Sequence, residues 1–285
     1  MSFEHQRDKG AYGFIVDGVP GAHPWLIDAP AHWSRLEVIV TLASEPRLPE
    51  ESIDSSRAVV RVPPDGWVLI DRTRSRATFS LPALPPASAL VHPHLAAVAV
   101  ADAHWRDRES FHAGGFVAGG MVWGVLGEKG AGKSSFLASL AQAGVPIVSD
   151  DVLVIDGGAA LAGPRSIDLR AGAAQRLGVG EALGTIGLRE RWRLALGPVE
   201  AELPFAGWIE LHWAQRVGVT AKRGSERLRT LVAHRGLRAT PARPQRLIEL
   251  AALPVLELSR PQRWESHEDA IDALLHAVDG AGEPR

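Results

Sequence analysis

The chain has 285 residues, a formal net charge of −2 and no cysteine. This length allows one large or two small domains with a sizeable hydrophobic core. The balanced charge argues against a nucleic-acid surface, and the lack of cysteine excludes disulfides, thiolate metal sites and cysteine nucleophiles.

The apolar pattern argues against export and membrane insertion. The first ten residues, MSFEHQRDKG, are polar and contain no apolar signal core. No stretch approaches the roughly 18 consecutive apolar residues that span a bilayer. We therefore expect a soluble, cytoplasmic protein without membrane or nucleic-acid partners.

Residues 1–87 are predicted to form a small β-rich N-terminal domain without a catalytic constellation. Proline-rich segments at 63–64 and 82–86 separate its elements, and Trp25 and Trp33 could line a binding surface or, more commonly, pack in a core. Strands are expected at residues 11–16, 36–42, 58–62, 66–71 and 76–81, the last two as a hairpin.

Residues 88–105 are predicted to form a helix, because apolar residues recur along it at helical spacing. His92, His94 and His104 lie in this stretch and suggest a metal cluster at first sight. Pro93 separates the first two, however, and no acidic partner is in register. We therefore interpret all three as solvated or structural histidines.

A glycine-rich segment follows an apolar strand predicted at 121–126 and precedes a helix predicted at 135–143. Residues 127–134 read GEKGAGKS and fit the phosphate-loop pattern G-x-x-x-x-G-K-[ST]. Glycines let backbone N–H groups turn toward phosphate oxygens, while the helix N-terminus and Lys133 add positive charge. The Ser134 hydroxyl is placed to bind Mg²⁺. A chance glycine-rich turn is the alternative. The predicted nucleotide-binding residues are Gly127, Glu128, Lys129, Gly130, Ala131, Gly132, Lys133, Ser134 and Ser135.

Two adjacent carboxylates follow that helix, which is expected to end at Gly144. Asp150 and Asp151 interrupt an apolar strand predicted over 145–155, where burying them unpaired would be costly. In a right-handed βαβ unit the second strand commonly lies close to the first, which would bring both carboxylates to the phosphate loop. A turn capping a surface strand is the alternative.

Three blocks in this order resemble the HPr kinase/phosphorylase family, whose relatives include phosphoenolpyruvate carboxykinases and the kinases that tailor lasso peptides. The blocks are His112-Ala113-Gly114, residues 127–135 and Ser149-Asp150-Asp151, and together they span about 40 residues. The resemblance implies an α/β fold with α+β elements, with a P-loop kinase domain at 88–285. It also implies ATP and Mg²⁺ as cofactors.

The resemblance further implies roles for individual residues. Lys133 would reach the β- and γ-phosphates, and Ser134 would bind Mg²⁺. One of Asp150 and Asp151 would hold the metal while the other accepts a proton. The family favours Asp150 as the base and Asp151 on the metal side, although the sequence alone does not order them. His112 would orient or tune the base. The predicted catalytic residues are therefore Lys133, Asp150, Asp151 and His112, and the predicted metal ligands are Ser134, Asp151 and Asp150.

Residues 156–158 are predicted to form a hairpin turn, followed by a strand at 159–162. The family places an acidic or arginine-bearing segment after it, beside the active site. Arg165, Asp168 and Arg170 are the candidates, although Asp168 could instead cap the short helix predicted at 171–177.

Charged residues continue through the remaining chain. Arg189, Arg191 and Arg193 alternate along a predicted strand and share one face, which fits phosphate contact or a solvated edge. A strand at 205–213 follows, in which Glu210 and His212 share a face. Residues 215–229 and 236–246 are arginine-rich and could form a substrate-binding flap or solvated surface. A strand at 255–258 and a packing helix at 266–278 complete the pattern.

These features predict an ATP- and Mg²⁺-dependent kinase that phosphorylates a hydroxyl group, most simply a serine of a peptide or protein. A small-molecule alcohol kinase and a non-catalytic ATP-binding regulator or assembly factor are the alternatives. A further signature of HPr kinases after the acid pair is missing, which argues against HPr itself as the acceptor and leaves reverse phosphorolysis open. The N-terminal domain would recognise the acceptor or pack against the kinase domain. A homo-oligomer stays open, because the family often forms symmetric assemblies.

Overall fold

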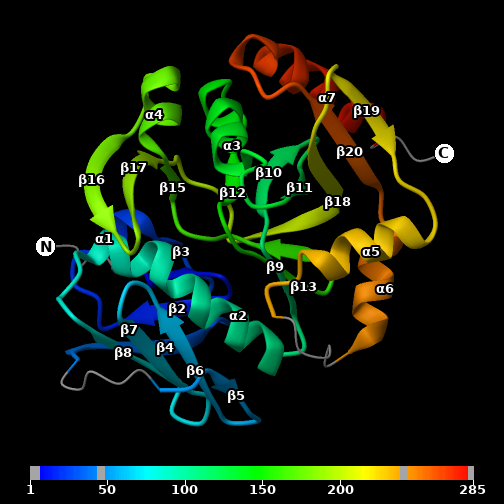
Figure 1. Ribbon diagram of the computed structural model, residues 1–285. Helices are drawn as coiled ribbons and strands as arrows, with labels where there is room; N and C mark the ends of the chain where they lie inside the picture. The colour runs from blue at the N-terminus through cyan, green and yellow to red at the C-terminus, as the bar shows by residue number, and fades with distance from the viewer. Residues whose placement is uncertain (1–6, 44–48, 238–242, 282–285) are drawn as a thin grey trace, which may run out of the picture.

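The computed structural model describes residues 7–43, 49–237 and 243–281, and it shows a mixed α/β protein. An eight-stranded sheet lies at one end, a nine-stranded sheet lies at the other, and a three-stranded sheet stands beside the second (Figure 1). Within the described residues, every helix is too short or too polar to traverse a lipid bilayer.

The first sheet contains residues from the N-terminal part of the chain, in the order β3-β1-β2-β4-β8-β7-β6-β5. The single strand predicted at 11–16 is wrong. Tyr12 and Gly13 have φ angles of 58° and 94°, which reverse the chain and divide it into two paired strands. The other four predictions are confirmed. The strands are β1 Lys9–Ala11, β2 Phe14–Asp17, β3 Ile27–Asp28, β4 Ser34–Leu42, β5 Ser52–Ile53, β6 Arg57–Val62, β7 Gly66–Asp71 and β8 Arg76–Leu81.

Residues 87–105, called the linking segment, are helical but are interrupted at His92, so the single helix predicted at 88–105 is only partly confirmed. The linking segment consists of α1 Ala87–Ala89, the turn η2 Leu90–His94 and α2 Leu95–Trp105. His92 has φ −141° and ψ 120°, an extended conformation that breaks the helix before Pro93.

Helix α2 lies between the two large sheets (Figure 1). It is apolar around most of its circumference, and Leu95, Val98 and Ala101 are buried. The Trp105 indole N–H donates to the carbonyl of Asp54, 2.7 Å away in the first sheet. One continuous apolar cluster joins both sheets through this helix. The division into two domains near residue 87 stays a prediction.

The second sheet brings several strand ends to one edge. Its order is β12-β10-β11-β18-β14-β13-β9, and β20 pairs with β18 and β19. Strands β11, β18 and β20 are parallel, and β12 runs the same way because β10 is antiparallel to both β11 and β12. The strands are β9 Glu109–Phe111, β10 Gly114–Ala118, β11 Met121–Leu126, β12 Ile147–Ser149, β13 Leu153–Asp156, β14 Ala159–Leu161, β18 Glu202–Trp213, β19 Gly218–Ala221 and β20 Val255–Arg260.

The remaining elements surround this sheet. The third sheet has the order β15-β17-β16, from β15 Ser166–Leu169, β16 Glu181–Ile186 and β17 Arg189–Ala195. The helices predicted after the glycine loop, at 171–177 and near the C-terminus are confirmed. The helices are α3 Lys133–Gln142, α4 Ala171–Leu177, α5 Ser225–Ala233, α6 Pro244–Ala252 and α7 His267–Ala281, with 3₁₀ turns η1 His23–Trp25 and η3 Trp264–Ser266.

Helix α5 begins within the segment 215–229 and α6 begins within the segment 236–246, the two segments interpreted as a flap or solvated surface. Strand β19 lies in the first segment, and residues 238–242 of the second lie outside the described part. Pro244 begins α6, where proline is tolerated because a first-turn residue needs no backbone N–H.

Arg193 connects the linking segment to the third sheet through hydrogen bonds. Its guanidinium donates to both carboxylate oxygens of Asp168, at 2.7 and 2.9 Å. It also donates to the carbonyls of Ser88 and His92, both at 2.6 Å. The side chains of Arg193 and Asp168 are each only 1% exposed. This charge pair is therefore buried and saturated with hydrogen bonds.

We expect Arg193→Met to lower the free energy of unfolding by about 3–5 kcal/mol, because it leaves a buried carboxylate and two carbonyls short of a donor. Urea unfolding measures this loss. Arg189→Met removes the same charge from an exposed position on the same strand and should cost no more than about 0.5 kcal/mol. Equal unfolding midpoints for the two variants would contradict the role assigned to Arg193.

Candidate functional site

The glycine loop joins β11 to α3 at the edge where the parallel strands end. Gly127, Gly130 and Gly132 have φ angles of 153°, 91° and 82°, where a side chain would be strained. Gly132 is the N-cap of α3, and no side chain bonds to the helix start. The first backbone N–H groups of α3 are therefore available to an anion.

Lys133 lies inside this loop. Its ammonium group donates to the Gly127 carbonyl at 2.6 Å. Burial lowers the pKa of Lys133, while the charges of Asp151 and Asp150 act in the opposite direction. The structure thus places the predicted cation within the loop and in the electrostatic field of the predicted acid pair.

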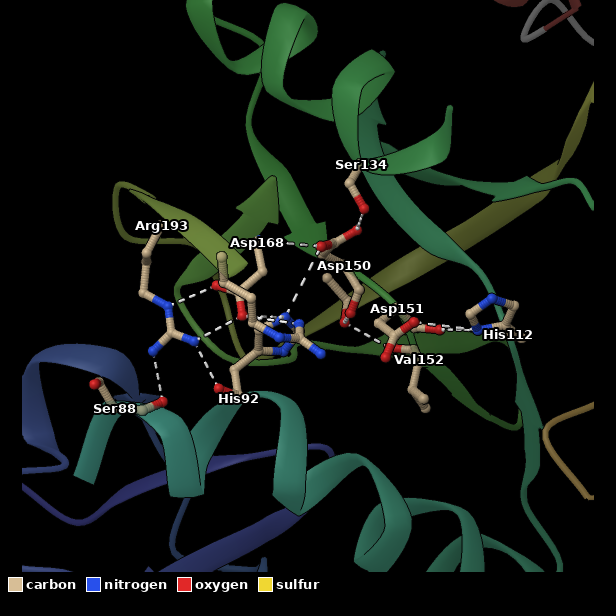
Figure 2. A network of polar contacts seen from close by, with 11 residues as sticks. Ser88, His92, His112, Ser134, Asp150, Asp151, Val152, Asp168 and Arg193 are labelled. Atoms are coloured by element: carbon tan, nitrogen blue, oxygen red, sulfur yellow. Dashed lines mark hydrogen bonds and ion pairs between the residues drawn. The ribbon is translucent and has the colours of Figure 1, made fainter. Parts of the chain in front are cut away.

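The acid pair lies between β12, which ends at Ser149, and β13, which begins at Leu153, so the single strand predicted over 145–155 is divided in two. β10 lies between β12 and β11, so the two strands are not direct neighbours. They end at the same edge nonetheless, and the Ser134 hydroxyl donates to Oδ1 of Asp150 at 3.0 Å (Figure 2). Residues that lie one helix and one strand apart in the sequence therefore meet.

Asp150 and Asp151 have different surroundings. Asp150 is 3% exposed, and burial together with the charge of Asp151 raises the pKa of Asp150 to about 7. The Asp151 side chain is 40% exposed, and its φ of 71° marks a sharp turn. The turn is closed by the Ser149 hydroxyl, which donates to the Val152 carbonyl at 2.5 Å. The turn sends the two neighbouring carboxylates in different directions.

His112 contacts Asp151 twice. Its Nδ1 lies 3.0 Å from the carbonyl oxygen and 3.2 Å from Oδ1 of Asp151 (Figure 2). Burial and the charge of Lys133 lower the pKa of His112, which favours the neutral ring. Both partners are acceptors, which assigns the ring hydrogen to Nδ1 and leaves a lone pair on Nε2. His112 thus orients Asp151.

His92 is a buried neighbour of the site that the sequence interpretation missed. Its Nε2 lies 3.9 Å from Oδ2 of Asp150 and 3.8 Å from Oδ2 of Asp168. The expectation that no acidic partner is in register is therefore wrong. Burial lowers the pKa of His92. The sequence feature that could have indicated this is Pro93. The helix breaks before this proline, and the extended conformation of His92 directs its side chain toward the acids.

Asp168 lies on β15 and is not a helix cap, since Arg170 is the N-cap of α4. Its backbone N–H approaches Oδ2 of Asp150 at 3.4 Å. Burial alone would raise the pKa of Asp168, but the hydrogen bond from Arg193 and the nearby positive charges lower it overall. Arg191 also binds Asp168, at 3.0 Å. Asp168 is therefore an ionised part of the network.

The other candidate arginines and tryptophans have varied environments. Arg165 is buried and donates to the carbonyls of Ile147 and Gly197, a structural role. Arg170 and Arg189 are exposed, whereas Arg191 and Arg193 pair with Asp168 and do not form a solvated edge. Trp33 is buried and donates to Glu202. Trp25 is partly buried against the core, with the Arg193 guanidinium 5.3 Å from its ring centre, so both tryptophans have packing roles.

An aromatic pocket lies on the other side of the glycine loop, where β18 and β20 end. It has a volume of about 230 Å³ and is lined by Gly130, Gly132, Ser135, Trp213, Arg260, Gln262, Arg263, Trp264 and His267. Arg260 lies 4.2 Å from the ring centre of Trp213 and donates to the Ala131 carbonyl at 2.7 Å. The sequence signal was a tryptophan and an arginine at the ends of two strands, but only the pairing of these strands brings them together.

The oxygen donors at the loop fit Mg²⁺. The Ser134 hydroxyl and the Asp150 carboxylate are hard oxygen ligands in contact with each other, and Mg²⁺ completes its shell with phosphate oxygens and water. Among the described residues, no group of three or more His, Asp or Glu side chains is arranged to hold a metal ion alone. The donor set therefore suits a cation that arrives with a phosphate ligand.

Comparisons with known proteins include a distant likeness to a solved structure. No protein-family model and no curated protein matches the chain. Among solved structures, the Hpr(Ser) kinase/phosphatase from Coxiella burnetii matches at 13% identity and a TM-score of 0.32, covering 61% of this chain and 99% of that chain. With a TM-score below 0.5, this likeness shows neither a shared fold nor a shared activity.

We expect His267, in the wall of the aromatic pocket, to make stability depend on pH. Burial and the charge of Arg260 lower the pKa of His267 from 6.5 to about 4. The unfolded chain therefore binds a proton on acidification before the folded chain does, and the free energy of unfolding falls from about pH 6.5 to about pH 4. Urea unfolding across this range should show a smaller fall for His267→Gln than for the wild type.

His276→Gln provides the matched control, because His276 is exposed on the same helix. It should keep the wild-type pH dependence. An identical pH dependence for His267→Gln and the wild type would contradict the assignment.

Proposed function

We propose that the protein is an ATP- and Mg²⁺-dependent phosphotransferase that moves the γ-phosphate of ATP to a hydroxyl group. The observation that carries this proposal is the 3.0 Å contact between Ser134 and Asp150. It joins a loop suited to phosphate with a buried carboxyl group whose pKa of about 7 suits proton transfer. The three motif blocks further support an HPr kinase-like domain at 88–285 and a smaller domain at 1–87.

The proposed nucleotide lies along the edge formed by the strand ends. Its phosphates bind the loop from Gly127 to Ser134, and its base enters the aromatic pocket beside Trp213 and Trp264. The γ-phosphate then faces Asp150. This direction is supported by the two sites flanking the loop on opposite sides, one aromatic and one acidic.

In the proposed reaction, the acceptor oxygen forms a bond to the γ-phosphorus as the bond to the β–γ bridging oxygen breaks. The hydroxyl proton passes to Asp150, and ADP leaves. Lys133 neutralises charge on the phosphates, and Asp151, held by His112, lies on the metal side. Ser134 and Asp151 would hold Mg²⁺, which would supply further neutralisation of the phosphate charge. Positioning and charge neutralisation supply most of what phosphoryl transfer requires.

We propose a serine of a peptide or protein as the acceptor, with a small alcohol as the alternative. A non-catalytic ATP-binding regulator is the second class. The acid pair and His112 favour the enzyme, because nucleotide binding alone needs neither. Tight ATP binding without product across a panel of peptides and alcohols would favour the regulator.

We expect Asp150→Asn to bind ATP within a few-fold of the wild type and to lose about 100-fold or more in the rate of phosphate transfer, because the proton acceptor is removed.

Lys133→Ala should lose about 100- to 1,000-fold in the rate of phosphate transfer, because a preorganised charge is removed. ATP consumption with Mg²⁺, together with mass spectrometry of peptide and alcohol acceptors, measures both effects.

Asp156→Asn is the control, because it makes the same change from acid to amide away from the acid pair. Asp156 is the last residue of β13, at the end away from the acid pair, and it binds Arg108. This variant should retain wild-type transfer. Near-normal turnover by Lys133→Ala would show that the loop is not the site of reaction.

We expect Trp213→Ala to weaken ATP binding about tenfold or more, because stacking of a base on an aromatic ring contributes about 1–3 kcal/mol. Trp213→Phe should retain most of the affinity. Binding of inorganic tripolyphosphate, which lacks a base, should be unchanged in both variants. Equal weakening of tripolyphosphate binding would show that Trp213 acts only on the loop, through its indole N–H, which donates to the Gly130 carbonyl at 3.3 Å.

A further inference from the structure

We propose that the acceptor carries an anionic group, a phosphate or a carboxylate, and that this group binds in a second cleft beside the glycine loop. This inference rests on the proposed function. The cleft has a volume of about 590 Å³ and is called the hairpin cleft here because the β16–β17 hairpin forms one wall. Its lining residues are Pro63, Pro93, His94, Lys129, Arg170, Ala171, Gly187, Leu188, Arg189, Glu190 and Arg191.

The hairpin cleft is positively charged. Lys129, Arg170 and Arg189 come from three separate elements, and all three are exposed. None of these side chains forms an ion pair or a hydrogen bond with another residue in the described part of the chain. Glu190 is the one acidic residue in the lining. Because the whole chain has a net charge of −2, this positive charge is local. It therefore selects for an anionic ligand.

The shape of the cleft distinguishes these residues from scattered surface charges. The three cations face a shared hollow whose size falls in the range of small-molecule sites, about 300–1,000 Å³. Leu188 at the hairpin tip is 78% exposed, and Pro63 and Pro93 add further apolar surface. An acceptor could therefore combine anion binding with apolar contact.

The cleft is built partly from the same elements as the proposed reaction centre. Lys129 belongs to the glycine loop. His94 lies two residues after His92, whose Nε2 is 3.9 Å from Oδ2 of Asp150. Arg191 in the wall binds Asp168, which contacts Asp150 through its backbone N–H. Figure 2 shows this polar network between the linking segment and Asp150. A molecule anchored in the cleft would therefore lie on the Asp150 side of the glycine loop, with its hydroxyl group facing the proposed γ-phosphate position.

The position of the cleft also agrees with the direction of the nucleotide. The β16–β17 hairpin and β18–β20 lie on opposite sides of α3 (Figure 1). A base in the aromatic pocket leaves the hairpin cleft free. Acceptor and nucleotide would then approach the loop from opposite sides, as transfer between them requires.

Binding of matched probe pairs tests the inference on the full chain, with Mg²⁺ and a saturating non-hydrolysable ATP analogue filling the loop. One pair is the pentapeptide Asp-Glu-Ser-Asp-Glu and its neutral counterpart Asn-Gln-Ser-Asn-Gln. The other pair is glycerol 3-phosphate and glycerol. We expect the anionic member of at least one pair to bind at least tenfold more tightly. The favoured pair identifies an acidic peptide or a phosphorylated small alcohol as the source.

The double variant Arg170→Gln/Arg189→Gln should weaken binding of that anionic probe at least tenfold and leave binding of the ATP analogue unchanged. Arg229→Gln, an exposed arginine of α5 outside the cleft, should behave as the wild type. Equal binding within both pairs, or tight anion binding that persists in the double variant, would overturn the inference while leaving the nucleotide site intact. Loss of analogue binding in the wild type would instead overturn the proposed function.

Discussion

The buried carboxylate of Asp168 accepts hydrogen bonds from Arg191 and Arg193, and the surroundings of the candidate site depend on this interaction. Through Arg193 it fixes the carbonyls of Ser88 and His92, so the linking segment cannot move independently of the third sheet. Buried ion pairs contribute little net stability compared with apolar packing, but losing one partner is costly. In this protein the ion pairs fix the position of the linking segment and so keep His92 beside Asp150.

A second constraint is the common direction of β11, β12, β18 and β20. Open sheets bind ligands at the carboxyl ends of their parallel strands, and these four ends carry the glycine loop, Asp150, Trp213 and Arg260. Each element contributes one type of chemistry to the same edge. The anion-binding loop lies between an acidic side and an aromatic side, which gives a bound nucleotide a direction.

Local chemistry made part of this arrangement predictable from the sequence. The loop at 127–134 could be recognised because its backbone geometry requires glycine. Long-range pairing was not predictable. The Arg193–Asp168 bond depends on the register of β15 against β17, and the approach of His92 to Asp150 depends on a break in a helix that apolar periodicity favoured. The turn at Tyr12 was missed because the residues on both sides of it suit a single strand.

Helix α2 has a consequence for how the molecule folds. It contacts both large sheets, so removing residues 1–87 would expose its apolar surface to water. A fragment beginning at residue 88 would therefore tend to aggregate whether or not its reaction centre were complete. Because both sheets pack against α2, unfolding of one sheet removes packing contacts from the helix that supports the other. The two sheets should therefore unfold in one cooperative transition.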